Sequence, residues 1–277
     1  MGYSPAWLKI LEAKLKDSNQ TVAIDSVTQL YSNAFKIQLD SVNCLAKFGP
    51  AIVDESLGLR EISQVANGPI TPRILISDNE ILLTEWIDQV SRSPGHEEEL
   101  GRCLANLHNR QGDYWGGGSH WIGNCEVDPV RDLDGAKFYG YRLVELAQRC
   151  GMQGEILPIV ERLDSLVPFG SPRLLHGDLW WGNILWGQAN NVWVIDPSQH
   201  YGHPEEDLAM LALFAPISER TIAAYQEIRS LEDGWPERVE LWQLYPLLVH
   251  TILFGEAYRS KAVRIAEQLN NFKTRKD

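Results

Sequence analysis

The sequence is poor in cysteine and lacks the cysteine pairs that commonly bind metals. Its 277 residues include four cysteines, and no two of them are spaced as C-x-x-C. This argues against a disulfide framework and against a cysteine-based metal site. We expect each cysteine to be a small buried side chain in a reducing compartment, which predicts a cytoplasmic protein. The four are Cys44, Cys103, Cys125 and Cys150.

Long apolar runs are also missing, so the sequence offers no candidate membrane span. The first sixteen residues place Trp7, Leu8, Leu11 and Leu15 at helical spacing, with charged residues between them. This spacing predicts an amphipathic helix and not the apolar core of a signal peptide.

Positive charge is in deficit. The chain has 25 Lys and Arg against 37 Asp and Glu, which gives a net charge of -12. Binding to nucleic acids depends on basic side chains that neutralise phosphates, and binding to anionic membranes depends on similar basic patches. We therefore expect neither a nucleic acid nor a membrane as partner. Separately, we expect a monomer with a small-molecule partner.

The first part of the sequence is rich in strand signals. Residues 20–88 contain alternating and β-branched segments separated by turn residues, among them Asp40-Ser41. One helical segment interrupts them at residues 52–65. These patterns predict an antiparallel sheet with one inserted helix.

The second part is mainly helical. We predict a helix over residues 155–167, a short strand pair at 183–187 and 191–197, and mostly helix from residue 207 onward. Polar residues and a proline cluster at 89–94, which predicts the boundary between two lobes there.

Together these patterns predict an α+β fold of two lobes. An N-terminal lobe of residues 1–88 holds a helix and then a sheet, and a C-terminal lobe of residues 89–277 is helical. A cleft between two lobes is the usual place for a ligand.

The segment "LLHGDLWWGNILW", residues 174–186, places polar residues between two apolar runs. Protein kinases carry the pattern H-R-D-L-x-x-x-N in their catalytic loop, followed by a further Asp on the next hairpin. Here Asp178 and Asn183 have that spacing, and Asp196 follows at the end of the next predicted strand. A simpler interpretation is that His176 and Asp178 only stabilise a turn.

Three segments carry a resemblance to a known family: "LLHGDLWWGN", "VIDPSQHYGHPEEDLAM" and "LYPLLVHTILFGEAY". They resemble the fructosamine/ketosamine-3-kinase family, which shares the protein-kinase-like fold of aminoglycoside and choline phosphotransferases. The resemblance extends from about residue 21 onward and implies ATP and Mg²⁺ as cofactors.

The resemblance also implies roles for single residues. It implies that Asp178 is the catalytic base and that Asn183 and Asp196 bind the metal. It implies that Lys47, on a predicted strand, binds the ATP phosphates and that Glu55, on the following helix, pairs with it. Without the resemblance, a strand lysine and a solvated helix charge are the simpler interpretations of the last two.

Other residues are assigned by the same resemblance. Glu85, Trp86 and Ile87 form the hinge whose backbone binds adenine. His176 and Asp207 are structural, with Asp207 bracing the catalytic loop from the start of a helix.

The resemblance also implies which residues lie near the substrate. His203 and Glu205 lie in the segment expected to face the sugar. Trp180 is a candidate wall of the substrate cleft, although packing is the commoner role of an aromatic side chain.

These observations predict a kinase that phosphorylates the 3-hydroxyl of ketosamines, namely fructosamine- or ribulosamine-type adducts on a protein lysine or a free amine, for deglycation. One alternative is a kinase of an aminoglycoside or amino alcohol, favoured by the acidic run at 205–207. Another is a nucleotide-binding pseudokinase, because "DSVTQLYSNAF" lacks the glycines expected of a phosphate loop. A metallohydrolase is disfavoured, since no H-x-x-x-H pair occurs.

Overall fold

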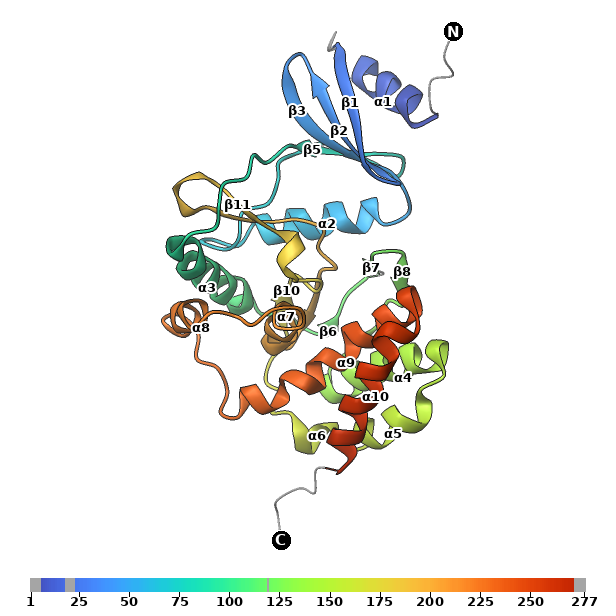
Figure 1. Cartoon of the computed structure of the whole chain (residues 1–277), viewed down its shortest axis with the longest axis vertical. Coiled ribbons are helices and arrows are strands. Elements are labelled where there is room, and N and C mark those ends of the chain that lie inside the picture. Colours follow the sequence, from blue (N-terminus) through green and yellow to red (C-terminus); the bar gives the residue numbers. More distant parts are fainter. Residues whose placement is uncertain (1–5, 18–22, 119, 272–277) are drawn as a thin grey trace.

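The computed structural model describes residues 6–17, 23–118 and 120–271, and Figure 1 shows two lobes stacked along the long axis. One lobe is an antiparallel sheet with helices against it, and the other is mainly helical. This arrangement confirms the predicted α+β fold. Within these residues, no helix is both long enough and apolar enough to cross a bilayer.

The smaller lobe is built on one five-stranded antiparallel sheet in the order β1-β2-β3-β5-β4. The predicted turn at Asp40-Ser41 connects β2 to β3, and both residues have positive φ, as tight hairpin turns require. The strands are β1 (Ile24–Tyr31), β2 (Ala34–Leu39), β3 (Val42–Lys47), β4 (Ile74–Ser77) and β5 (Leu82–Glu85).

Helix α1 (Ala6–Asp17) covers one face of this sheet (Figure 1). Leu11 and Leu15 are buried against sheet residues such as Ile37. The ring of Trp7 stacks on Phe35 with 4.1 Å between ring centroids. The predicted amphipathic helix is therefore confirmed. Each buried leucine contributes roughly 1.5–3 kcal/mol of apolar transfer free energy.

Helix α2 (Ile52–Ser63) lies between the sheet and the larger lobe (Figure 1). Its buried side includes Ile52, Leu59 and Ile62. A Cβ at Gly58 would approach the Pro197 side chain to 3.0 Å. The absence of a side chain at Gly58 thus allows α2 to pack closely against the segment after Asp196.

The larger lobe has helices that enclose a second core. Helix α3 begins after Ser93, whose hydroxyl accepts a hydrogen bond from the His96 N–H in a capping box. The helices are α3 (Pro94–Asn109), α4 (Gly135–Cys150), α5 (Gln153–Val160), α6 (Leu163–Leu166), α7 (Pro204–Leu211), α8 (Glu219–Gln226), α9 (Trp235–Phe254) and α10 (Glu256–Asn271).

Two features of the larger lobe differ from the prediction. The segment 155–167 forms the two helices α5 and α6 and not one, with the break at residues 161–162. A four-stranded sheet in the order β10-β13-β6-β9 was not predicted. Its strands, Arg173–Leu175, His200–Gly202, Trp115–Gly116 and Arg131–Asp132, are too short to show a period of two.

A small hairpin pairs β7 (His120–Ile122) with β8 (Cys125–Val127).

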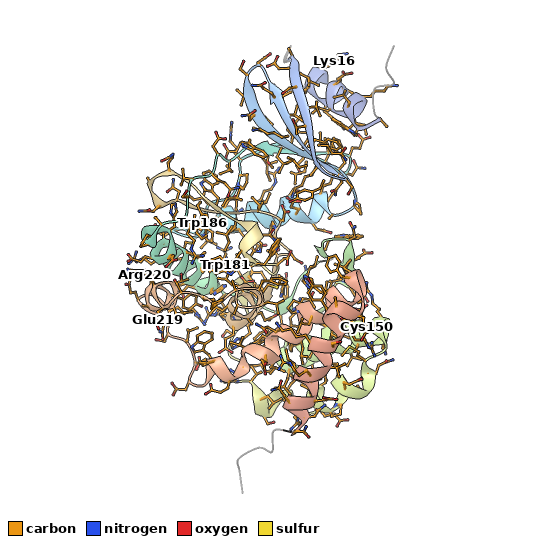
Figure 2. All side chains as sticks on the ribbon, viewed as in Figure 1. Lys16, Cys150, Trp181, Trp186, Glu219 and Arg220 are labelled. Carbon is orange, nitrogen blue, oxygen red and sulfur yellow. The ribbon has the colours of Figure 1, made fainter. Side chains whose placement is uncertain are left out.

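The predicted strand pair is the hairpin of β11 (Ile184–Trp186) and β12 (Val192–Val194). It is bonded to the segment between α2 and β4 and to the segment between β5 and α3, which connects the lobes. Ile70 exchanges backbone hydrogen bonds with β12, and the Val90 N–H donates to the Trp186 carbonyl at 2.8 Å. Trp181 and Trp186, labelled in Figure 2, lie on the same side of the molecule. The hairpin thereby holds the loop before it and the Asp after it at the junction of the lobes.

Candidate active site

The loop at 176–178 is held in place by a carboxylate beneath it. Asp207, in the first turn of α7, accepts the His176 N–H at 2.8 Å and the Gly177 N–H at 2.9 Å. It also meets His108 Nε2 at 3.2 Å. Burial raises the pKa of Asp207, but the hydrogen bond to His108 and the backbone hydrogen bond from Gly177 outweigh it, and the net direction is downward. Asp207 is therefore an ionised carboxylate that fixes the loop backbone.

His176 connects the loop to the end of β12. Its Nδ1 accepts the Asp178 N–H at 3.3 Å, so Nε2 carries the proton and donates to the Ile195 carbonyl at 2.9 Å. Burial lowers the pKa of the His176 imidazole. The ring is thus neutral and serves as a fixed spacer between the loop and the hairpin.

Gly177 replaces the Arg of the protein-kinase pattern for a steric reason. Its φ is 81°, in the left-handed region. A Cβ at this position would overlap the carbonyl oxygen of Ser198. Only glycine allows the loop and the segment after β12 to lie this close.

Asp178 and Asn183 are joined directly. The Asn183 amide donates to the Asp178 carbonyl at 2.8 Å and to its carboxylate at 3.2 Å. Burial raises the pKa of Asp178 to about 7, and the neighbouring Asp196 adds to the effect. A carboxylate with such a pKa is suited to accept a proton near neutral pH.

Lys47 on β3 lies between two carboxylates. Its Nζ is 2.8 Å from Glu55 Oε1 on α2 and also contacts Asp196. Burial raises the pKa of Glu55 to about 7, although Lys47 opposes that change. Burial alone would lower the pKa of Lys47, but the two carboxylates outweigh it and the net direction is upward. The charged lysine is therefore held at the junction of the lobes.

The chemistry of the side chains suits a hard divalent cation. Asn183 presents an amide oxygen, because its nitrogen is the atom that donates to Asp178. Asp196 follows β12 with a φ of 56° and has a carboxylate that is 43% exposed. No cluster of three or more His, Cys, Asp or Glu side chains arranged for a metal occurs in the described residues. Two oxygen ligands from the protein fit Mg²⁺, which is usually shared with phosphates and water.

The segment after β5 offers one backbone donor. The Glu85 N–H donates to the Arg73 carbonyl and the Trp86 N–H to the Asn43 carbonyl. The Ile87 N–H donates to no other group in the described chain. Of the three predicted hinge residues, Ile87 therefore has the N–H that remains available to a ligand.

His203 and Glu205 are occupied in the interior and do not line the cavity beside Asp178. His203 caps α7, accepting the Glu205 N–H, and its ring stacks on Trp242 at 4.9 Å. Burial lowers the pKa of His203 to about 4. Glu205, 2% exposed, pairs with Arg238 at 2.6 Å and accepts from the Trp242 indole at 2.8 Å. The structure thus brings neither residue to the open side of the loop.

Trp180 lies beside the loop and is 40% exposed. Its indole folds over Gly182, where a side chain would overlap it, and meets the ring of Phe214 edge-on at 6.1 Å. Beyond Phe214 a hollow of about 710 Å³ opens between α8 and α9. None of the predicted site residues lines that hollow, so it is separate from the chemical site.

A small cavity of about 10 Å³ adjoins Asp178 and was missed by the sequence analysis. The residues around it come from four separate parts of the chain, which is why no local pattern revealed them. The segment "LYPLLVH" was a signal, because it was recognised as a motif but was given no role. The lining residues are Ile122, Gly177, Asp178, His200, Glu206, Asp207, Met210, Trp242, Tyr245 and Pro246.

The fold is that of small-molecule phosphotransferases. The structure of choline kinase LicA from Streptococcus pneumoniae superposes with a TM-score of 0.64 over 96% of this chain and 99% of that one. The two sequences are 11% identical, so the likeness concerns the fold. It defines a protein-kinase-like fold, with the residues described above gathered at the junction of its lobes.

Closer relatives narrow the class. A Thermobifida fusca protein crystallised under the name of a fructosamine-3-kinase has a TM-score of 0.83 and 31% identity, over 93% of this chain and 97% of that chain. An Enterococcus faecium protein named "Probable ketoamine kinase" is 33% identical over 94% of each sequence. The chloroplastic protein-ribulosamine 3-kinase of Arabidopsis thaliana is 30% identical, over 79% of this chain and 72% of that protein.

A model of the family described as fructosamine kinase matches residues 13–272. The chain belongs to the fructosamine kinase family. It is accordingly a kinase, a phosphotransferase of a family that uses ATP.

Proposed function

We propose that this kinase transfers the γ-phosphoryl group of ATP to the 3-hydroxyl of a ketosamine, a sugar joined through an amine to a protein lysine or to a free amine. The observation that carries the proposal is the convergence of Lys47, Glu55, Asp178, Asn183 and Asp196 at one lobe junction. The names of the ketoamine and ribulosamine kinases among its relatives support this acceptor class.

Asp178 is the proposed base. The acceptor oxygen forms a bond to the γ-phosphorus as the bond from phosphorus to the ADP oxygen breaks, and Asp178 takes the hydroxyl proton. The hydrogen bond from Asn183 orients the carboxylate for this step. A pKa of Asp178 raised to about 7 by burial supports proton acceptance near neutral pH.

Lys47 and Glu55 are proposed to bind the nucleotide. Lys47 contacts the α- and β-phosphates, and Glu55 keeps its ammonium in position. When the phosphates enter, they replace Asp196 as a partner of Lys47. Asn183 and Asp196 would hold Mg²⁺, and the bound ion would supply positive charge against the transferred phosphoryl group.

Adenine is proposed to bind the segment after β5. The free Ile87 N–H is the donor on which this assignment depends, since the N–H groups of Glu85 and Trp86 are used within the sheet. The domain boundary near residue 89 then separates a lobe that covers ATP from a lobe that holds the acceptor.

By analogy with the family, phosphorylation at the 3-hydroxyl would make the adduct labile, because the phosphate can then leave by elimination and water can hydrolyse the bond to the amine. The activity would therefore remove sugars from amines.

The test is ADP formation with ribulose-, erythrulose- and fructose-lysine, in the presence of magnesium. We expect turnover on at least one of them by the wild type and a loss of at least 10³-fold in kcat for Asp178→Asn, in line with the role of a positioned base. The matched control is Asp164→Asn, an exposed residue on α6, which should behave as the wild type.

Two outcomes would contradict the proposal. ATP binding without turnover on any ketosamine would indicate a different acceptor, such as an amino alcohol. No binding of ATP and magnesium would favour a pseudokinase, for which the glycine-free turn between β1 and β2 would then be the reason.

A further inference from the structure

The cavity beside Asp178 is lined by one buried hydroxyl that lacks a partner, and a buried guanidinium with unpartnered N–H groups packs against that residue. Tyr245 on α9 lines it, is 4% exposed, and its hydroxyl has no hydrogen-bond partner in the described chain. Arg142 on α4 is 2% exposed and has unpartnered Nε and Nη2 groups. Leaving a buried polar group unpaired costs free energy, so such groups usually indicate a water or a ligand.

Arg142 builds a rigid wall behind the cavity. Its Nη1 donates to Glu206 at 2.9 Å and to His200 Nε2 at 3.1 Å. His200 in turn donates from Nδ1 to the Ser198 carbonyl at 3.0 Å. The guanidinium lies 3.6 Å from the centre of the Tyr245 ring, over its face. The ring of Tyr245 is thereby fixed while its hydroxyl remains available.

The chemistry of the cavity selects an oxygen atom. The carboxylates that line it are already used: Glu206 accepts from Arg142 and from the His203 N–H, and Asp207 accepts from the loop backbone. The groups without partners are donors or hydroxyls. A ligand hydroxyl can satisfy both the Tyr245 hydroxyl and the Arg142 N–H groups, whereas an ammonium group can satisfy only the Tyr245 hydroxyl.

The volume limits what enters. About 10 Å³ accommodates one oxygen-sized group. A ketosamine carries its bulky amine beyond C1, and this end must extend to solvent when the amine belongs to a protein. The group that enters the enclosed side must therefore come from the opposite end of the sugar.

We propose that this cavity is an acceptor subsite for the 4-hydroxyl, the oxygen on the carbon after the phosphorylated one, and that Tyr245 Oη binds it. This inference rests on the proposed function, because it takes a ketosamine as the acceptor at Asp178. The wall of Arg142, His200 and Glu206 keeps Tyr245 in position.

The test combines one variant with one substrate analogue. Steady-state kinetics are measured for the wild type and Tyr245→Phe, each with ribulose-lysine and with its 4-deoxy analogue. We expect Tyr245→Phe to lower kcat/KM for ribulose-lysine at least tenfold. With the 4-deoxy analogue the two proteins should agree within twofold, because the hydroxyl that Tyr245 binds is already missing.

The matched control is Tyr139→Phe. Tyr139 is equally buried, but its hydroxyl donates to the Leu241 and Trp242 carbonyls and does not line the cavity. This variant should keep wild-type kinetics and lose melting temperature. Tyr245→Phe should keep or raise the melting temperature, because it removes a hydroxyl that is unpaired without substrate.

Three results would overturn the inference. Equal kcat/KM of wild type and Tyr245→Phe on ribulose-lysine would remove Tyr245 from substrate binding. The same loss on both substrates would show that its hydroxyl acts elsewhere. A wild type without turnover on any ketosamine would overturn the proposed function, and the ketosamine subsite with it.

Discussion

At the scale of single residues, the catalytic loop depends on close approaches that few side chains allow. Gly177 lies against the Ser198 carbonyl, and the Asp178 carboxylate meets the Asn183 amide at 3.2 Å. Asp207 receives two consecutive backbone N–H groups from the same loop. Because every group in the loop is fixed by a neighbour, the position of Asp178 is determined before any ligand binds.

The first prediction concerns Gly177→Ala. The added Cβ would overlap the Ser198 carbonyl, and alanine disfavours the left-handed φ that Gly177 adopts. We therefore expect the free energy of unfolding to fall by about 2–4 kcal/mol. The displaced loop should also lower kcat by at least tenfold. Urea denaturation and steady-state kinetics measure both effects.

Gly154→Ala is its control. Gly154 lies in α5, and a Cβ there meets no atom within 4 Å. This change should stabilise the protein by about 0.5–1 kcal/mol, as alanine does in a helix. A Gly177→Ala protein as stable and active as the wild type would contradict the steric argument.

At the scale of elements, α2 and β3 act together. The helix reaches the larger lobe through the close packing at Gly58, and its Glu55 holds Lys47 of β3. The site is therefore shared between lobes: β3 and α2 provide the ion pair, and the loop and hairpin provide Asp178, Asn183 and Asp196. A shift of α2 would separate Glu55 from Lys47. The position of this helix therefore affects the proposed binding of the nucleotide.

The second prediction tests this pair with Glu55→Gln. The amide keeps the shape of the side chain but removes the charge that orients Lys47, so we expect KM for ATP to rise about tenfold, with a smaller fall in kcat. Glu161→Gln, an exposed position after α5, is the control and should leave both constants unchanged. An unchanged KM for ATP in Glu55→Gln would refute the proposed role of the pair.

At the scale of the whole molecule, buried histidines make stability depend on pH. His203 and His176 have pKa values lowered by burial, the former to about 4. Their neutral forms favour the folded state. Between pH 6.5 and about 4 the unfolded chain binds a proton at His203 that the folded chain does not bind, so stability is full above this window and falls as the pH decreases through it.

The third prediction is the amount by which His203 makes the free energy of unfolding depend on pH. Unfolding in urea should show a decrease of about 3 kcal/mol from pH 7 to pH 4 attributable to His203. His203→Gln should be less stable at pH 7, because it loses the stacking on Trp242, but should show a flatter dependence on pH in this window. If the free energy of unfolding fell equally with pH in His203→Gln and in the wild type, the role of His203 would be contradicted.

Much of the fold was accessible from the sequence because its signals are local. The i, i+3, i+4 spacing in α1, the turn at Asp40-Ser41 and the apolar strands around the loop each occupy one short segment. The spacing of Asp178 and Asn183 is equally local, and it directed attention to the part of the chain that the structure places at the lobe junction.

Contacts in the interior between segments far apart in the chain could not be predicted from the sequence. Glu205 accepts hydrogen bonds from Arg238 and Trp242, which lie 33 and 37 residues further along the chain. No periodic pattern in the sequence predicts such a pairing. Tyr245 and Arg142 meet across the larger lobe from α9 and α4 for the same reason. The acidic run at 205–207 thus looked like an exposed cationic-ligand site although its carboxylates have internal partners.

The most direct test of the central claim is to locate the phosphate on the product by phosphorus and carbon NMR after incubation of ribulose-lysine with ATP and magnesium. The account predicts a phosphate on O3 with the wild type and no product with Asp178→Asn. A phosphate on another oxygen, or full product formation by Asp178→Asn, would contradict it.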